Sequence, residues 1–364
     1  MPRVCRPFES ATRVRIPAGA PLPSMANPRL ISYPALNIDS KSYPMTPDEL
    51  HDYAYALKNA LENVEKDPGI RAADRSLILS FHKHIKAQGV SLGRQAKYLN
   101  NLRTVSLADR VPWRKAKRRD IEDLITKLAD HEIVSKKTKQ TRHYSPETMA
   151  DFHMVIKRFQ KFVRYGDTDK DTPYPEEVRW LRKNVKESDR RAPLWFTDQE
   201  IEAMIKAAGT LRDRAFIAAY GEMGGRPAEF LLLRIGDLTF DDDGVIVRVR
   251  KGKTGFRTVR LIASAPYLAD HVSIHPYHDD PQAPLWLTTA TNHLNQPMSW
   301  LSADKLVKEV AGKAGIKQER AHMYMFRHGS ATRNARFLTD SELRLMYGWS
   351  PTSRVPGRYI HLSG

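Results

Sequence analysis

Apolar residues recur every three or four positions along most of the chain, a spacing that predicts a mainly helical protein. In the first half, helices are expected from Thr46 to about Lys66, over 77–85, from Ser91 to 105, over about 120–131, and from Ser145 onward. The first and last of these begin with a capping residue, a proline and a nearby glutamate. This half is therefore expected to be all helical.

The pattern changes in the second half. Periodicity stops over residues 183–194, which predicts a linker, and Thr197-Asp198-Gln199-Glu200 then starts a new helix. From Val245 to Val249 the apolar period becomes two, and a return segment over 258–262 follows a glycine-rich turn that holds Lys253. This arrangement predicts a β-hairpin. Further helices are expected to start at Ser302 and Thr339, so the second half is α+β.

The chain thus divides into four parts. Residues 1–40 carry several prolines and arginines without apolar periodicity and are expected to be disordered. A helical domain over 41–182, the linker over 183–194 and the α+β domain over 195–364 follow.

The net charge of the chain indicates which class of molecule it binds. The chain has 59 Lys and Arg against 42 Asp and Glu, a net charge of +17, and no apolar run long enough for a membrane helix. The expected partner is therefore nucleic acid rather than a membrane. The single cysteine, Cys5, excludes a disulfide framework and a cysteine-built zinc site, and it suits a reducing, cytoplasmic location.

Two basic clusters lie in the helical half. A charge run is most often only a solvated face, but two of them in so basic a chain favour contact with DNA phosphates. The clusters are Arg114, Lys115, Lys117, Arg118 and Arg119, and then Lys136, Lys137, Lys139 and Arg142.

Three cationic residues of the second half stand in unusual surroundings. Arg226 follows a Gly-Gly turn, with Glu229 three residues on and able to hold its guanidinium; Lys253 lies between glycines; Arg327 lies near the start of a predicted helix. Taken singly, each has a structural explanation: a salt bridge at a helix start, a solvated turn lysine, and an ion pair at the core edge.

These three sites and the end of the chain follow one another in the order typical of one family of enzymes. In this order of motifs the sequence resembles the tyrosine recombinase (lambda-integrase-like) family. The final block, Arg-Tyr359-Ile-His-Leu-Ser-Gly, is most similar to archaeal-type integrases. The resemblance rests on Gly-Gly-Arg226-Pro-Ala-Glu229, Lys253-Thr-Gly-Phe-Arg257, Phe326-Arg327-His328 with Ala331-Thr332, and Tyr359.

The resemblance implies a SAM-like helical core DNA-binding domain followed by the catalytic domain of a site-specific recombinase. Tyr359 would attack a DNA phosphate to form a 3′-phosphotyrosyl link, with no metal or cofactor. Arg226 and Arg327 would meet the charge of the transition state. Lys253 would protonate the leaving 5′-oxygen, with Lys251 as the alternative if the hairpin register differs by two.

The implied partner is double-stranded DNA, bound by a homotetramer on two paired sites, and the resemblance also allows an accessory DNA-bending protein. The implied setting is the nucleoid of a prokaryote, or a virus. The other hypotheses are a type IB topoisomerase-like relaxing enzyme and a catalytically weak DNA-binding protein of the same fold.

Two catalytic positions depart from the common pattern. Tyr324 stands where the family usually has histidine, and it cannot supply an imidazolium charge; His322 would face elsewhere on the helix. Trp349 replaces a second histidine, a change found within the family, and its indole N–H can still donate. His328 is expected to support the structure behind Arg327.

Two other interpretations are weaker. Tyr347 is a rival nucleophile, but its apolar neighbours predict a packing residue. His271, His275 and His278 could suggest a metal site, but they lie by prolines of a surface loop and the expected chemistry needs no metal.

Overall fold

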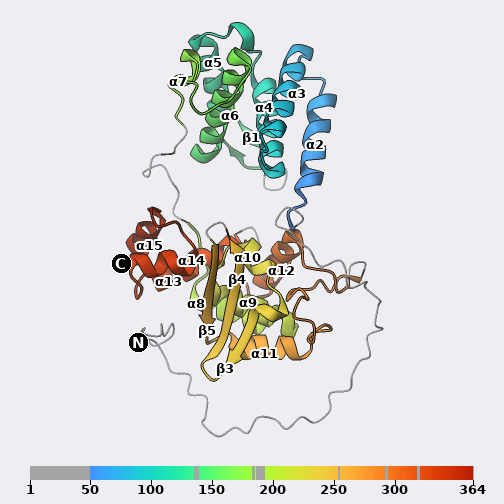
Figure 1. Cartoon of the computed structure of the whole chain (residues 1–364), viewed down its shortest axis with the longest axis vertical. Helices are drawn as coiled ribbons and strands as arrows, with labels where there is room; N and C mark the ends of the chain where they lie inside the picture. The colour runs from blue at the N-terminus through green and yellow to red at the C-terminus, as the bar shows by residue number, and fades with distance from the viewer. Residues whose placement is uncertain are drawn as a thin grey trace. The chain divides into compact units, whose positions relative to one another are not determined.

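The computed structural model describes residues 50–134, 139–182, 185, 193–252, 255–291, 294–317 and 320–363. The predicted disordered segment 1–40 and most of the predicted linker lie outside these residues. The chain forms two compact units, one over His51–Ala192 and the other over Pro193–Gly364, whose core also contains Leu50 (Figure 1).

The first unit is a helical bundle. Its buried core includes Ile78, Phe81, Leu99 and Phe159, which lie on the predicted apolar stripes. The helices are α2 (Tyr53–Lys66), α3 (Ala72–Ala87), α4 (Leu92–Ala108), α5 (Arg118–Asp130), α6 (Pro146–Tyr165) and α7 (Glu176–Arg179), with a 3₁₀ turn, η1, at Trp113–Lys115.

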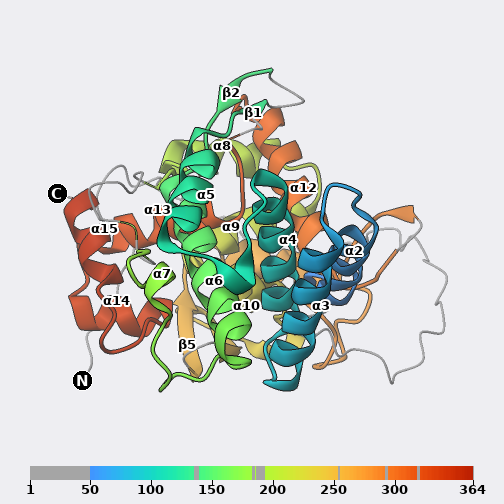
Figure 2. The same ribbon diagram turned by 90° about the horizontal axis from the view of Figure 1, so that it is seen from above.

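Two details of this unit differ from the prediction. It is not all helical, because β1 (Ile133–Val134) pairs antiparallel with β2 (Thr141–Arg142) in a ribbon that projects beyond the helices (Figure 2). Two-residue strands are too short to produce an alternating pattern. The helix α2 begins at Tyr53, with Asp52 accepting from the Tyr55 N–H; Thr46 lies outside the described residues.

The second unit packs helices against a three-stranded antiparallel sheet of order β3-β4-β5. Figure 1 shows α9 behind the sheet and α13 to α15 beside the β5 edge. The elements are α8 (Asp198–Ala207), α9 (Leu211–Met223), α10 (Pro227–Leu231), a 3₁₀ turn, η3 (Ile235–Asp237), β3 (Leu238–Asp241), β4 (Gly244–Gly252), β5 (Gly255–Leu261), α11 (Ala265–Ser273), α12 (Trp300–Lys313), α13 (Tyr324–Asn334), α14 (Asp340–Tyr347) and α15 (Val355–Ser363).

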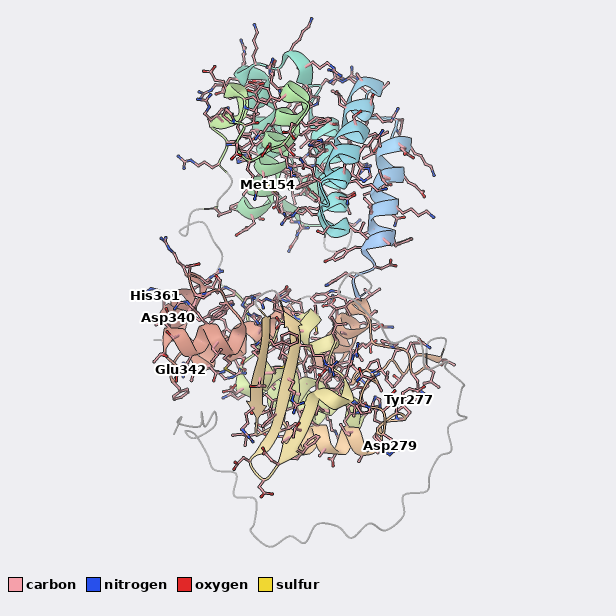
Figure 3. The ribbon with its side chains drawn as sticks, viewed as in Figure 1. Met154, Tyr277, Asp279, Asp340, Glu342 and His361 are labelled. Carbon is pink, nitrogen blue, oxygen red and sulfur yellow. The ribbon has the colours of Figure 1, made fainter. Side chains whose placement is uncertain are left out.

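The predicted hairpin is confirmed as β4 and β5. Val245, Val247 and Val249 are buried against the helices, while Arg248 and Arg250 lie on the exposed face. The capping boxes at Thr197 and Thr339 are also confirmed. Asp340 and Glu342, in the first turn of the helix that Thr339 caps, are labelled in Figure 3.

Two predictions for this unit need correction. The short strand β3 was not predicted, because most of its residues are exposed and give no buried alternation. The helix predicted to start at Ser302 instead begins at Trp300, since Ser299 is its cap and accepts the Ser302 N–H. Within the described residues, no helix is long and apolar enough to cross a membrane.

Candidate active site

The site begins where α9 ends. Gly224 closes this helix in the left-handed conformation, with φ of 55°. A Cβ at this position would lie 2.5 Å from the Ser330 Cβ, so α13 approaches too closely for any side chain. The Gly-Gly turn therefore brings α9 against α13 and delivers Arg226 to the start of α10.

Glu229 holds Arg226, as the sequence predicts. Its carboxylate accepts from the Arg226 Nη1 at 2.7 Å and from the Arg226 backbone N–H at 3.0 Å. It also accepts from the Nη2 of Arg257 at 2.6 Å, and both partners of that pair are 5 % exposed. One buried carboxylate thus orients two arginines from different parts of the chain.

The turn that ends α14, Met346–Gly348, binds three arginines through three consecutive carbonyls. The Met346 oxygen accepts from Arg257 Nε at 2.9 Å, the Tyr347 oxygen from Arg327 Nη2 at 2.8 Å, and the Gly348 oxygen from Arg226 Nη2 at 2.7 Å. We call this segment the arginine-binding turn. It fixes the three side chains before any ligand arrives, and each guanidinium has further N–H groups.

Arg327 is the most enclosed of the charges expected at the phosphate. It is 5 % exposed, and its Nη1 also donates to the Gly224 carbonyl at 3.1 Å. Burial lowers its pKa, and the neighbouring charge of Arg226 lowers it further. Two arginines held this close raise the energy of the empty site, so the arrangement is suited to an anion.

Tyr359 lies near Arg327 because both side chains pack against the ring of Trp349. Its ring lies parallel to that of Trp349, with centroids 5.4 Å apart, and the Arg327 guanidinium lies 5.5 Å from the Trp349 ring centre. The Tyr359 side chain is 4 % exposed, and its hydroxyl lies 2.7 Å from the Nδ1 of His328. His328 therefore contacts the expected nucleophile directly; its support of the structure behind Arg327 stays a prediction.

The other tyrosines are placed differently. Tyr324 opens α13, is 45 % exposed, and lies beside Trp300 and His328, with ring centroids 6.1 and 6.3 Å away. Tyr347 is fully buried, and its hydroxyl is 2.7 Å from both the Ser330 Oγ and the Asn334 Nδ2. The packing role predicted for Tyr347 is confirmed.

Several predicted residues lie outside the described part or belong to the first unit. Lys253 is outside the described residues, as are Lys136, Lys137 and the side chain of Lys251; β4 and β5 pair on either side of Lys253, through Gly252 and Gly255. The other basic residues named above are exposed, on η1, the start of α5, and the β1–β2 ribbon: Arg114, Lys115, Lys117, Arg118, Arg119, Lys139 and Arg142.

The histidine group is not arranged as a metal site. The ring of His271 stacks on Trp286, and its Nε2 lies 2.9 Å from the Leu285 carbonyl. Nowhere in the described ranges are three His, Cys, Asp or Glu side chains placed to hold a metal ion.

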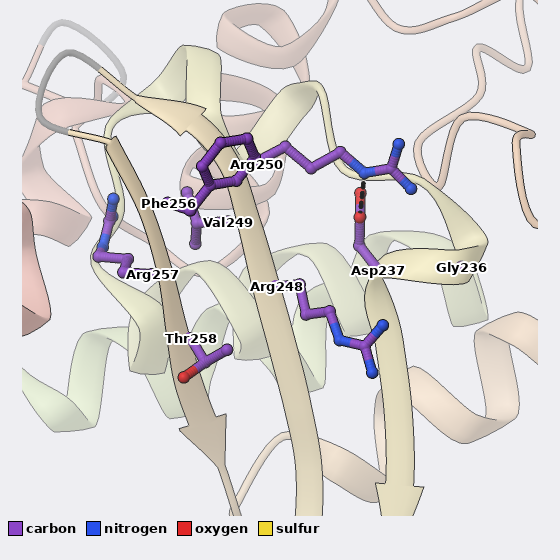
Figure 4. A pocket seen from close by; sticks show the side chains of 8 residues that line it. All are labelled: Gly236, Asp237, Arg248, Val249, Arg250, Phe256, Arg257 and Thr258. Atoms are coloured by element: carbon purple, nitrogen blue, oxygen red, sulfur yellow. Dashed lines mark hydrogen bonds and ion pairs between the residues drawn. The ribbon is translucent and has the colours of Figure 1, made fainter.

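Two hollows of the surface are lined in part by Arg257. One, of about 570 Å³, lies on the open face of the sheet, where Arg250 reaches Asp237 and Phe256 is 82 % exposed (Figure 4). The other, of about 370 Å³, lies between the hairpin and α14 and is lined by Arg257 and Trp349 among others. Asp237 is thus an ion-pair partner of Arg250 on this face of the sheet.

Glu229→Ala is expected to destabilise the second unit by about 3 kcal/mol, because it leaves the buried Arg257 without its counter-charge. Burial alone would raise the pKa of Glu229, but hydrogen bonds and charges from Arg257 and Arg226 lower it overall. The contribution is therefore complete above the ordinary pKa of about 4.5 and is lost as pH falls through the lowered value.

Urea unfolding between pH 3 and pH 7 measures this difference. Glu202→Ala is the matched control, since its pair with Lys206 is 65 % and 73 % exposed and contributes little. Equal stability of the two variants at pH 7 would contradict the anchoring role of Glu229.

Known proteins resemble this chain in sequence. Residues 194–364, the whole second unit apart from its first residue, match the phage integrase family. Across 312 residues the chain is 22 % identical to the tyrosine recombinase XerH of Campylobacter jejuni, covering 82 % of this chain and 79 % of the relative.

Solved structures share the fold. XerH bound to a palindromic difH substrate, in a post-cleavage complex, aligns with a TM-score of 0.56 at 14 % identity, covering 87 % of this chain and 93 % of that one. A lambda integrase tetramer bound to a Holliday junction aligns with a TM-score of 0.56 at 12 % identity, covering 77 % and 78 %. The archaeal-type branch stays a prediction, but residues 194–364 belong to the phage integrase family, and the chain is a site-specific tyrosine recombinase.

Proposed function

We propose that this recombinase cleaves and rejoins DNA through Tyr359, which attacks the scissile phosphate and holds it as a 3′-phosphotyrosyl link. One observation supports the proposal most directly: in a buried site, the ring of Trp349 stacks on Tyr359 and also lies beside the guanidinium of Arg327. The covalent link stores the energy of the broken phosphodiester bond, so the strand can be resealed without a nucleotide cofactor.

Arg226 and Arg327 bind the non-bridging oxygens of the phosphate. As the tyrosine attacks, negative charge builds up on those oxygens, and two guanidinium groups already fixed by carbonyls stabilise it without reorganisation. This supplies the positive charge that a metal ion would otherwise provide. Trp349 donates its indole N–H, and Tyr324 lies in the place of the usual histidine at the rim.

Lys253 donates a proton to the 5′-oxygen as it leaves, with Lys251 as the alternative donor. The family resemblance supports this role, and the pairing of Gly252 with Gly255 is consistent with a short connection that carries Lys253. A lysine at the end of a hairpin can reach into a DNA groove because the strands on either side support it.

DNA is the partner of the whole chain, and the exposed basic clusters of the helical unit bind its phosphates without reading sequence. Four copies act on two paired sites, because strand exchange needs two duplexes; the lambda integrase tetramer on a Holliday junction supports this assembly. The proposal also includes an accessory DNA-bending protein as a further partner, and the nucleoid as the place where the protein acts.

Trapping and mapping the covalent adduct tests the proposal. The full chain is incubated with a random-sequence library of nicked duplexes, in which the short 5′-hydroxyl fragment diffuses away after cleavage. The expected product is one peptide joined through Tyr359 to a 3′-phosphate, and sequencing of the attached DNA reports the target. A link to Tyr324 or Tyr347, or the absence of any adduct, would refute the assignment.

A further inference from the structure

His328 and Tyr359 form a close pair that the catalytic roles above do not use. The Nδ1 of His328, on α13, lies 2.7 Å from the hydroxyl of Tyr359, on α15. The two rings are near parallel, with centroids 6.0 Å apart. A hydrogen bond of this length between helices that are separate in the sequence fixes both side chains.

The two groups differ in what they can do with a proton. Burial lowers the pKa of His328 to about 4, and the nearby charges of His322, Arg358 and Arg327 act in the same direction. Its imidazole is therefore neutral at pH 7, with one nitrogen free to accept. Burial raises the pKa of Tyr359 despite the charges of Arg327 and Arg358, so the phenol keeps its proton. The phenol must therefore lose that proton when it attacks.

Among the side chains that the structure describes, the other neighbours of Tyr359 offer no comparable acceptor. Tyr324, in the place of the usual family histidine, carries a phenol and has no ring nitrogen to accept a proton. Trp349 stacks on the ring of Tyr359, and an indole N–H only donates. The contact that the structure gives to the Tyr359 hydroxyl is with His328.

We propose that His328 is the general base of this enzyme and accepts the proton of Tyr359, which Tyr324 cannot do. The inference rests on the proposed function of Tyr359. As the phenol oxygen forms its bond to phosphorus, its proton passes to Nδ1 of His328, the bond from phosphorus to the 5′-oxygen breaks, and that oxygen takes a proton from Lys253. On rejoining, the 5′-hydroxyl returns a proton to Lys253, and the departing tyrosine recovers its own from His328.

His328→Asn separates proton acceptance from positioning. The amide can still hydrogen-bond the phenol, but it cannot take up the proton at neutral pH. Single-turnover cleavage should slow by about 100-fold at pH 7, a typical loss for a general base. The wild-type rate should be nearly constant between about pH 6 and 8, whereas the variant rate should rise about tenfold per pH unit as phenolate forms.

The control is His322→Asn, the same change at a histidine that does not contact Tyr359; it should keep the wild-type rate and pH profile. His328→Gln serves as the second variant, and thermal unfolding of each protein establishes that it is folded. A His328→Asn rate within threefold of wild type, or one that is constant with pH, overturns the proposal.

A substrate with sulfur in place of the bridging 5′-oxygen distinguishes the two proton transfers, from Tyr359 to His328 and from Lys253 to the leaving 5′-oxygen. A thiolate leaves without protonation, so this substrate should restore cleavage by Lys253→Ala but not by His328→Asn. Rescue of His328→Asn would place the histidine on the leaving-group side and overturn the proposal. If wild-type protein forms no adduct at Tyr359, the proposed function itself fails; if it does and His328→Asn cleaves normally, only this inference fails.

Discussion

Tyr359→Phe is expected to abolish the covalent protein–DNA adduct while leaving DNA affinity within a few-fold of wild type. Phenylalanine keeps the ring that stacks on Trp349, so the packing of α15 is retained. It removes the oxygen that would form the bond to phosphorus. Adduct formation on a nicked duplex, measured beside a gel-shift titration at the same ionic strength, separates the two effects.

Tyr347→Phe is the matched control for that result. It removes the same atom from a tyrosine whose hydroxyl is buried between Ser330 and Asn334. This variant should lose some stability, because it leaves those partners unsatisfied, but it should still form the adduct. Adduct from Tyr359→Phe together with none from Tyr347→Phe would reverse the assignment of the nucleophile.

Arg327→Ala is expected to slow cleavage by about 1,000-fold or more, with DNA affinity changed only a few-fold. The guanidinium acts on charge that exists mainly in the transition state, whereas affinity comes from many phosphate contacts elsewhere. Arg327→Lys should also be strongly impaired. A single ammonium cannot donate to Gly224, to Tyr347 and to phosphate in the fixed directions of a guanidinium.

Arg333→Ala is the matched control, because Arg333 lies on the same helix and donates to the Gly221 carbonyl at 2.7 Å. It should lower the thermal midpoint as a buried contact is lost, yet cleavage per folded molecule should stay near wild type. Equal cleavage defects in both variants would show that Arg327 acts only through the fold.

Much of the second unit could be predicted from the sequence, because its signals are local. The capping boxes at Thr197 and Thr339 and the alternation in β4 depend on residues within a few positions of one another. The pairing of Arg226 with Glu229 spans one helical turn and was predicted for the same reason. The ribbon and β3 escaped prediction because short, exposed strands produce no period.

The remaining features of the site depend on contacts between distant segments. Arg257 belongs to one of the family-like blocks, but its link to Glu229 and to the Met346 carbonyl joins residues 28 and 89 positions apart. A backbone carbonyl has no side-chain identity, so the arginine-binding turn leaves no trace in the sequence. His328 was identified, but its contact with Tyr359 depends on how α13 and α15 meet.

The arginine-binding turn also has a consequence for synthesis of the protein. Arg226, Arg257 and Arg327 each have one carbonyl acceptor that is contributed by a residue after 345, and the proposed nucleophile, Tyr359, comes later still. A polypeptide that stops before residue 346 lacks these three carbonyls and Tyr359, although it still contains Glu229 and Gly224. The site is therefore complete only after the residues beyond 345 have been synthesised and have packed against the rest of the second unit.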